Sequence, residues 1–389
     1  MYRVGLSKTL SASTAVLIAL FWVVVARAGE QQGEDLVSPS PISTGVVDAV
    51  PDVRKEKSKF KFGSENIVAV PIPVSNPTFG SGLVLAGAYY YPQTVEQKKV
   101  QPPSFTGAGG VYTDNESYAF GMMQQNYWNE DRWRLNASGG YGDFKLELVE
   151  PVPGNDSQEI NWLIEGYFAQ ASLSRRILDS SWYVGGLLRY LDITQDFEID
   201  LNLPDYNLQS NIRSPSLGIT FEYDTRDNAT NAYTGLRFDS KALVSGKSGH
   251  NVSKYESYYL RLRGYHQLKI PVVIAWDVNG CKKSGEIPLW DTCRLNLRGF
   301  PATRYLSKKS LSTQVEARWK FYKRWGMVAF AGGGIVGSAT TDEFEDDVIP
   351  SYGVGLRFMV MKSQRINIRV DYARSDETSA WYLGVIEYF

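Results

Sequence analysis

The sequence predicts an all-β protein, a transmembrane antiparallel β-barrel of sixteen strands of the outer-membrane type. Three observations lead to this fold class. Polar and apolar residues alternate over many segments, many of these segments are long enough to cross a membrane as tilted strands, and short connections alternate with long ones. The composition agrees, because the 389 residues include 35 Gly, 24 Tyr and 10 Trp.

The first residues predict export. Arg3 and Lys8 make a basic start, residues 15–25 form an unbroken apolar run, and residues 26–28 read Ala-Arg-Ala, a cleavage site of the A-x-A type. A membrane anchor is the alternative, but the run is shorter than the roughly 20 residues that span a bilayer. We therefore predict a signal peptide over residues 1–28.

Residues 29–65 carry Gln, Ser, Pro and mixed charge, and they have no apolar period. This composition is typical of a segment that does not build a core. We predict a flexible periplasmic segment over residues 29–65, followed by one barrel domain over residues 66–389.

Period-two alternation dominates the predicted barrel. In residues 311–321 ("LSTQVEARWKF"), Leu, Thr, Val, Ala, Trp and Phe share one face, while Ser, Gln, Glu, Arg and Lys share the other. Many segments reach the ~10 residues that a tilted strand needs to cross a membrane. The predicted strands are 66–74, 81–91, 103–113, 117–128, 132–149, 161–178, 181–199, 214–226, 235–246, 255–269, 271–280, 311–323, 325–337, 351–361, 365–375 and 381–389.

A half-buried sheet in a soluble protein also alternates, and each strand alone is compatible with that alternative. The polar faces, however, carry too many charges for a dry interior between two sheets. A closed barrel accommodates both faces, because the apolar side chains meet lipid and the charged side chains meet a wet lumen.

The connections predict which end of the barrel is which. If the first strand starts in the periplasm, most periplasmic turns are short and most of the long connections are extracellular, as in outer-membrane barrels. Residues 92–103 and 227–234 are exceptions, because both are long connections on the periplasmic side.

The two cysteines, Cys281 and Cys293, lie in one predicted extracellular loop. In an exported protein such a pair most often forms a disulfide, with two free thiols as the alternative. His250 and His266 are the only histidines, so we expect no metal site. The net charge of −1 gives no reason to expect a nucleic-acid partner. We find no catalytic spacing or phosphate loop, and we expect neither an enzyme nor a cofactor.

The end of the sequence alternates up to an aromatic residue, as is typical of outer-membrane barrels. In "WYLGVIEYF", Trp381, Leu383, Val385 and Phe389 are predicted to share the outward face and to act as the C-terminal barrel signal. Glu387 breaks this pattern, and we expect it to lie in the headgroup region.

Several motifs, in this order, make the chain resemble the BamA/TamA outer-membrane assembly superfamily, also called the bacterial surface antigen family. They are "YDTRDNATNAYTGLRF" (223–238), "LRGFPATRY" (297–305), "STQVEARW" (312–319), "VAFAGGGIVG" (328–337) and the final Phe389. The resemblance implies an outer-membrane location. Because little sequence precedes the barrel, the chain is similar to single-domain members that lack periplasmic POTRA modules.

The resemblance also implies a functional loop. In that family the sixth extracellular loop folds back into the lumen, and its arginine pairs with an acid on the barrel wall. By match, Arg298, Gly299 and Phe300 form the loop motif and Glu316 is the wall partner, since an Arg can donate two parallel hydrogen bonds to a carboxylate. The alternative is a solvated outer loop whose arginine has no partner.

The chain departs from the family pattern at a second wall acid. The matching positions, residues 331–333, read Ala-Gly-Gly. Asp371 lies on the predicted luminal face of a later strand and is a candidate substitute, although nothing in the sequence joins it to Arg298.

The first predicted strand contains Pro71 and Pro73, two residues apart. Both therefore remove backbone donors from the same edge of that strand. If this edge faces the last strand, the barrel has a weak seam. The alternative is that both prolines lie in a lead-in before the barrel.

The resemblance implies a biogenesis factor that helps to insert or translocate proteins or lipids at the outer membrane. Its expected partners are outer-membrane lipids, client proteins or lipids, and periplasmic factors. A passive channel or a purely structural barrel without assembly activity is the alternative.

Overall fold

The computed structural model describes residues 67–150, 158–198, 209–248, 253–338, 343–362, 365–376 and 378–389. The predicted signal peptide and the predicted flexible segment up to residue 65 lie outside these residues. Within the described ranges, no helix has the length and apolar character needed to cross a membrane.

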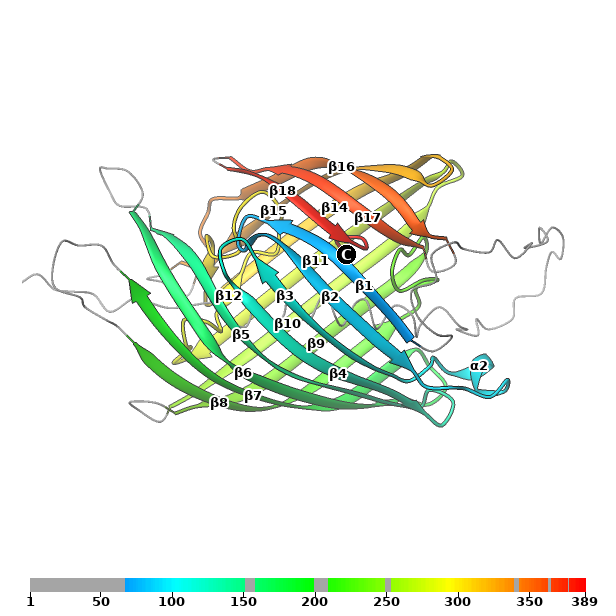
Figure 1. Cartoon of the computed structure of the whole chain (residues 1–389), viewed down its shortest axis with the longest axis horizontal. Helices are drawn as coiled ribbons and strands as arrows, with labels where there is room; N and C mark the ends of the chain where they lie inside the picture. The colour runs from blue at the N-terminus through cyan, green and yellow to red at the C-terminus, as the bar shows by residue number, and fades with distance from the viewer. Residues whose placement is uncertain are drawn as a thin grey trace, which may run out of the picture.

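The described residues form a closed antiparallel barrel of sixteen strands, which confirms the predicted fold class (Figure 1). A four-residue helix, α2 (Gln97–Val100), lies in the β2–β3 connection, and β12 (Cys293–Arg294) pairs with β13 (Leu306–Ser307) in a separate two-stranded sheet. The barrel strands are β1 (Ile67–Asn76), β2 (Gly80–Tyr90), β3 (Phe105–Thr113), β4 (Tyr118–Trp128), β5 (Trp133–Glu150), β6 (Gln158–Arg176), β7 (Trp182–Glu198), β8 (Ser210–Asp224), β9 (Gly235–Lys247), β10 (Ser253–Gln267), β11 (Val272–Gly285), β14 (Lys309–Tyr322), β15 (Trp325–Val336), β16 (Ile349–Met361), β17 (Ile366–Arg374) and β18 (Ser379–Val385).

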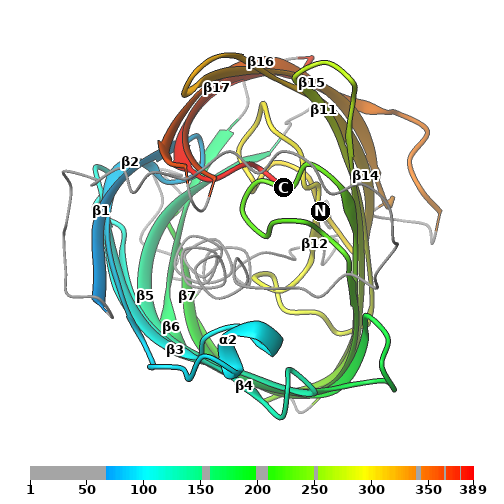
Figure 2. The same cartoon turned by 90° about the vertical axis from the view of Figure 1, so that its right-hand side faces the viewer.

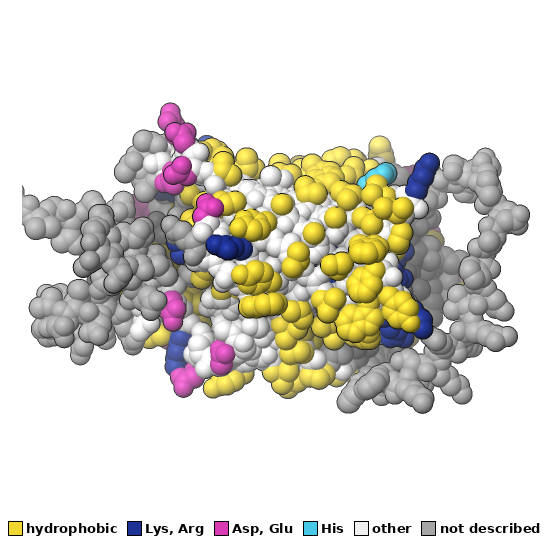
Figure 3. All heavy atoms as spheres, turned by 90° about the horizontal axis from the view of Figure 1, so that it is seen from above, with side chains coloured by type: hydrophobic (Ala, Val, Ile, Leu, Met, Phe, Trp, Pro, Cys, Tyr) yellow, Lys and Arg dark blue, Asp and Glu magenta, His cyan; other side chains and the backbone are white. Residues whose placement is uncertain are grey.

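The alternation of side chains produces an apolar exterior. On β14, Leu311, Val315 and Trp319 are exposed, whereas Gln314 and Glu316 are buried inside the barrel. The space-filling view shows apolar side chains spread over the middle of one face, with charged side chains gathered toward its two ends (Figure 3). This distribution is the one that a lipid bilayer requires of a spanning barrel.

We predicted that charged side chains and water line the whole inner wall of the barrel. The observed lumen differs, because part of its wall is apolar. Inward-facing side chains from β3 to β8 form a large apolar cluster that includes Phe105, Phe144 and Trp162. Leu289 and Trp290, from the loop between β11 and β14, belong to the same cluster. The prediction was wrong where this cluster lies, because side chains of the loop pack there in place of water.

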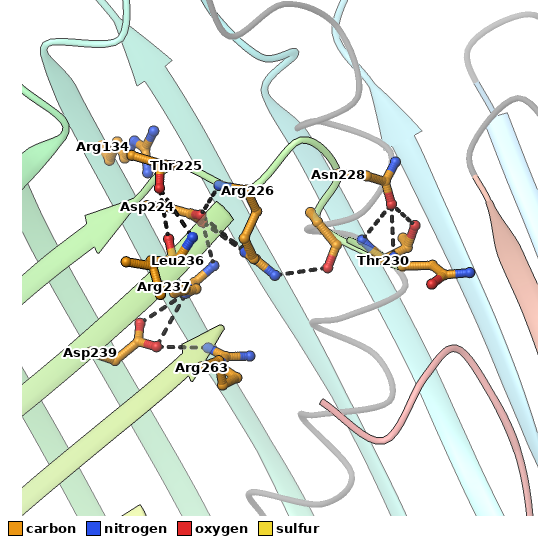
Figure 4. A network of polar contacts seen from close by, with 12 residues as sticks. Arg134, Asp224, Thr225, Arg226, Asn228, Thr230, Leu236, Arg237, Asp239 and Arg263 are labelled. Atoms are coloured by element: carbon orange, nitrogen blue, oxygen red, sulfur yellow. Dashed lines mark hydrogen bonds and ion pairs between the residues drawn. The ribbon is translucent and has the colours of Figure 1, made fainter. Parts of the chain in front are cut away.

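The long periplasmic connection at residues 225–234 is ordered by its own polar side chains. The Oδ1 atom of Asn228 accepts hydrogen bonds from the backbone N–H groups of Thr230 and Asn231, at 3.0 and 2.8 Å. All three residues are buried. The sequence marks this connection as an exception among the short periplasmic turns, and the structure shows that it folds as a compact, internally bonded unit (Figure 4).

A ladder of alternating charges joins this connection to β8, β9 and β10 (Figure 4). Asp224 accepts from Nη2 of Arg226 at 2.7 Å and from Nη1 of Arg237 at 3.2 Å. Asp239 accepts from Nε of Arg237 at 3.0 Å and from Nη2 of Arg263 at 2.7 Å. The 223–238 motif that carries part of the family resemblance therefore has a structural role at the periplasmic end of the wall.

Candidate functional site: the loop-six lock and the barrel seam

Loop six comprises residues 286–308, between β11 and β14, and includes β12 and β13. In the view along the barrel, this yellow segment lies inside the ring of strands (Figure 2). Its tip and its base contact different parts of the wall.

The tip of loop six is bound through Arg298, which has 0% exposed surface. Its guanidinium forms an ion pair with Glu316 on β14. Nη1 also donates to Asp371 on β17 at 3.0 Å, and Nη2 donates to Gln314 at 2.8 Å. The structure thus brings together the motif arginine and the wall acid that the resemblance implied, and it adds two further acceptors.

Two aromatic rings enclose the same guanidinium. The Cζ atom of Arg298 lies 3.4 Å from the ring centroid of Phe330 and 4.3 Å from that of Tyr388. These distances are within the range of cation–π attraction, which strengthens when the cation is desolvated. Glu316 accepts a second hydrogen bond from Nε of Arg318 at 2.8 Å, so the wall acid is itself held in place.

Asp371 occupies the role of the second wall acid that residues 331–333 lack. Besides Arg298, it accepts a hydrogen bond from Nη1 of Arg369 at 2.8 Å and pairs with Arg357. It is fully buried. Arg298 therefore has a second wall acid, supplied by β17 and not by β15.

The contacts of Gly299 and Phe300 show why a glycine and an aromatic residue follow Arg298 in the motif. Gly299 takes a φ of +115°, and a Cβ atom there would lie 2.9 Å from the carbonyl carbon of Arg374. Its N–H donates to the hydroxyl of Tyr382 on β18 at 2.8 Å. Phe300 is buried and meets the ring of Tyr305 edge-on, with the centroids 4.7 Å apart. A side chain at position 299 would separate the loop from the wall.

The base of loop six is held by a disulfide and a buried ion cluster. Cys281 on β11 is bonded to Cys293, as the spacing favoured. Between the two cysteines, Asp291 accepts from Nη2 of Arg189 on β7 at 2.7 Å, and its carboxylate lies 2.8 Å from Nζ of Lys283 on β11. Both Lys283 and Asp291 are buried.

Burial by itself would raise the pKa of the Asp291 carboxyl group, but its cationic neighbours outweigh that effect. The charges of Arg189 and Lys283, together with their hydrogen bonds, hold its pKa well below the ordinary value of an aspartic acid. The hydroxyl of Tyr255 also donates to this carboxylate, at 2.7 Å. Asp291 is therefore ionised throughout the physiological pH range.

Sequence reasoning missed this second anchor. The available signal was weak: an acid between Trp290 and the second cysteine, and Arg189 at an inward-facing position among leucines of β7. Nothing local links two residues that lie 102 positions apart in the chain.

The seam between β1 and β18 is the weakest joint of the barrel. Among the described residues, Ser75 and Leu383 are the one paired position between these strands. By contrast, β1 pairs with β2 along its whole length, from Ile67 to Asn76.

The hydrogen bonds of β2 show which way the backbone N–H and C=O groups of β1 residues point. The backbone N–H of Ser81 on β2 donates to Oδ1 of Asp114, next to β3, at 3.0 Å. The backbone carbonyl of Ser81 accepts from the N–H of Asp114 at 2.8 Å. Its backbone therefore faces away from β1, and its partner Ser75 faces away from β2, toward β18. Because the β1–β2 register is unbroken, Pro71 and Pro73 face the same way. Both missing donors lie on the seam edge, and both prolines lie inside β1 and not in a lead-in.

The end of the chain departs from the predicted outward alternation. Trp381 is 63% exposed and faces outward, but Phe389 is only 6% exposed and packs inside the barrel. β18 ends at Val385, and Ile386 takes a φ of +77°. Nη2 of Arg318 then donates to the carbonyl oxygen of Phe389 at 2.6 Å. The prediction that Phe389 faces lipid was wrong, because the buried arginine draws this segment inward.

Glu387 and the two remaining residues of the predicted signal are also placed by their partners. Glu387 is buried and accepts from Nε of Arg357 at 2.7 Å, so its expected position among headgroups was wrong. Leu383 is paired with Ser75 across the seam, and Val385 packs against an apolar cluster that includes Ile72.

The closed barrel, its apolar exterior and its internal loop define a sixteen-stranded bacterial outer-membrane barrel. Solved structures with a similar fold include BamA from Haemophilus ducreyi lacking POTRA domains 1–3, which is 13% identical with a TM-score of 0.57 over 95% of this chain and 78% of that chain. CdiB from Acinetobacter baumannii is 12% identical, with a TM-score of 0.56 over 83% of this chain and 60% of that one. CdiB from Escherichia coli is 10% identical, with a TM-score of 0.55 over 84% and 64% of the two chains.

These identities establish a likeness of fold. The resemblance inferred from motifs is confirmed at that level, since BamA, the family's namesake, is among the structures with this barrel. No protein-family model and no curated protein sequence matches the chain.

Proposed function

We propose that this protein is an outer-membrane biogenesis factor whose barrel opens at the β1–β18 seam to pass client proteins or lipids. The observation that supports it most is the seam itself, with its one paired position and its two proline-blocked positions. Each missing hydrogen bond is worth about 1 kcal/mol net and more in lipid, where water does not replace it. If a barrel has one pair of neighbouring strands with few hydrogen bonds, those two strands separate before the others.

The contacts of the loop-six tip, Arg298 and Gly299, which we call the loop-six lock, support the same proposal. They bind the β18 side of the seam more strongly than the β1 side. On the β18 side, the tip bonds to Asp371 on β17 and, through Gly299, to Tyr382 on β18. On the β1 side, the described contact is a neutral hydrogen bond from the N–H of Ala302 to the hydroxyl of Thr78, at 2.9 Å. The lock thus stiffens the β14–β18 wall and leaves β1 as the element that moves.

The second candidate is a passive channel or a structural barrel, and the closed ring of strands is what favours it. A channel needs an open lumen, whereas loop six crosses this one and is bonded to the wall at its base and at its tip. The proposal assigns the chain no catalytic role and no cofactor. It expects clients and periplasmic factors as partners.

A designed disulfide across the seam tests the proposal. Ser75→Cys with Leu383→Cys joins the paired position, and a matched pair, Met327→Cys with Leu356→Cys, joins two exposed positions across an ordinary ladder. Each variant replaces the native protein in cells, and the outer-membrane proteins and lipids are then quantified.

We expect the seam pair to abolish activity until a reductant is added, and the control pair to leave activity unchanged. An oxidised seam pair that keeps full activity would rule out lateral opening and favour the channel or structural alternative. The control pair also accounts for any effect of the reductant on the native disulfide.

A further inference from the structure

The periplasmic ends of β10, β11, β14 and β15 carry a group of cations that the proposed function does not use. Lys269 lies in the β10–β11 turn, Lys320 lies near the end of β14, and Lys323 and Arg324 form the β14–β15 turn. The two turns are neighbours, because the N–H of Lys320 donates to the carbonyl of Pro271 at 3.0 Å. We call these four residues the basic rim.

The basic rim has an excess of positive charge. Within the described part of the chain, none of its four residues has an ion pair with an acid. Other periplasmic cations are paired with acids, for example Arg132 with Asp179 at 3.4 Å and Arg134 with Asp131 at 2.7 Å. The basic rim therefore differs from these paired sites by its surplus of positive charge.

Aromatic side chains place the basic rim at the membrane interface. Trp319, Phe321, Tyr322 and Trp325 are all exposed around the same hairpin. Large apolar side chains lie beside Lys and Arg at the matching end of the barrel in the space-filling view (Figure 3). Tyr and Trp gather where hydrocarbon meets headgroups, and neighbouring Lys side chains extend to the phosphate level.

A cavity of about 250 Å³ lies under this hairpin and joins the basic rim to the lumen. Its charged lining consists of Lys320 and Arg324 from the rim, Arg318 and Arg357 from the lumen, and one acid, Glu387. Arg357 already neutralises that acid, at 2.7 Å. Arg357 also pairs with Asp371, and Arg318 pairs with Glu316, so the lining cations for which the described residues supply no acid are Lys320 and Arg324. These two cations make the rim end of the cavity suited to an anion.

Arg324 is held in position for such a role. Its Nη1 atom donates to the carbonyls of Met359 and Val360 on β16, at 3.5 and 3.2 Å. A backbone carbonyl cancels none of its charge. The remaining donors of a guanidinium are suited to phosphate oxygens, which it can bind in pairs.

We propose that the basic rim and the cavity beneath it form a binding site for the phosphate headgroup of an anionic phospholipid in the periplasmic leaflet. The phosphate meets Lys320, Lys323 and Arg324, and the acyl chains lie along the exposed Trp319 and Trp325. This inference does not depend on opening of the seam, so the two proposals succeed or fail separately.

The test measures lipid preference around the full-length protein. The protein is reconstituted in vesicles of phosphatidylethanolamine with a trace of spin-labelled phosphatidylglycerol or, in parallel, spin-labelled phosphatidylcholine. The fraction of motionally restricted label yields a relative association constant. We expect at least a roughly threefold preference for phosphatidylglycerol in the native protein, given the strength of cation–headgroup attraction.

Two triple variants remove equal charge at opposite ends of the barrel. K320Q/K323Q/R324Q is expected to lose the preference, and K254Q/K282Q/K308Q, on exposed lysines of the extracellular side, is expected to keep it. Native protein at about 1 M salt, where the Debye length is near 3 Å, should also lose it, which provides a test that does not depend on folding of a variant.

Inorganic phosphate at millimolar concentration distinguishes a lipid site from a site for free phosphate. We expect it to leave the lipid preference unchanged. Displacement of the lipid by phosphate would show a free-anion site and overturn the proposal. An equal preference in the native protein and both variants would overturn it as well.

Discussion

Arg298 shows how one residue concentrates the energetics of the lock. It is buried between Phe330 and Tyr388, and its charge is shared by Glu316 and Asp371. A buried cation with two acids is stable only as a set, because removal of one member leaves the others desolvated and unmatched.

Arg298→Ala is therefore expected to lower the free energy of unfolding by about 3–5 kcal/mol. The control is Arg213→Ala, which removes an arginine from an exposed ion pair whose arginine side chain is 62% exposed. We expect that change to cost less than about 1 kcal/mol. Thermal unfolding of both variants in the same detergent provides the measurement, and equal losses would mean that the buried cluster adds no stability.

Asp291 predicts a pH dependence for the base of loop six. Its pKa is depressed in the folded protein, so it contributes stability at pH values above its unfolded pKa, about 3.9, and loses that contribution as the pH falls toward the folded value. At pH values below about 4, we expect the Tm of the native protein to decrease as the pH falls. We expect this decrease of Tm with pH to be less steep in Asp291→Asn.

The matched control for this prediction is Asp179→Asn, whose carboxylate lies in an ion pair that is 90% exposed on the acid side. Its pH profile should follow that of the native protein. If Asp291→Asn shows the native slope, the acid-labile group is another carboxylate and the anchor is not Asp291.

At the scale of the element, β1 combines two opposite properties. Toward β2 it makes a complete ladder, and toward β18 it presents Pro71 and Pro73, which have no donor to offer. Prolines are found on sheet edges and rarely in central ladders. β1 is therefore built as an edge strand even though it lies in a closed ring.

Restoring the donors should strengthen the seam. In Pro71→Ala/Pro73→Ala we expect slower hydrogen exchange at β18 amides that face β1 and a loss of biogenesis activity, since the donor restored at position 73 lies opposite Val385, at the end of β18, and one hydrogen bond of about 1 kcal/mol becomes available. Pro92→Ala, at an exposed position in the β2–β3 connection, is the control. Unchanged exchange at β18 would show that the strands are kept apart by something other than the prolines.

At the scale of the whole molecule, loop six is a strap between opposite walls. Its base is bonded to Arg189 on β7 and Lys283 on β11, and its tip to Glu316 on β14 and Asp371 on β17. The lumen therefore holds an apolar cluster on β3–β8, next to the base of the loop, and a charged cluster on β14–β17 around its tip.

Because loop six crosses the lumen, its position should determine the ion conductance of the barrel. We expect the native protein to show low conductance in a planar lipid bilayer and Arg298→Ala to show frequent larger openings, because the released tip leaves the lumen. Arg213→Ala should behave as the native protein does. A large, steady conductance of the native protein would favour the passive channel.

The sequence by itself determined the barrel and its strand number, because alternation and strand length are local properties and each is repeated many times. It also placed the two cysteines in one loop and the two prolines on one edge, since both inferences need only short spacings. The resemblance brought Arg298 and Glu316 into one hypothesis. In the structure these residues form an ion pair, 18 positions apart in the chain.

Only the tertiary structure decided the remaining partners. Asp371 reaches Arg298 across 73 positions, and Arg189 reaches Asp291 across 102, so no local pattern connects them. The inward turn at Phe389 was likewise decided by tertiary contacts, because alternation predicts a lipid-facing ring and a buried arginine on another strand overrides it. Local periodicity sets which face a side chain takes along a strand, whereas buried charges select their partners only after the barrel has closed.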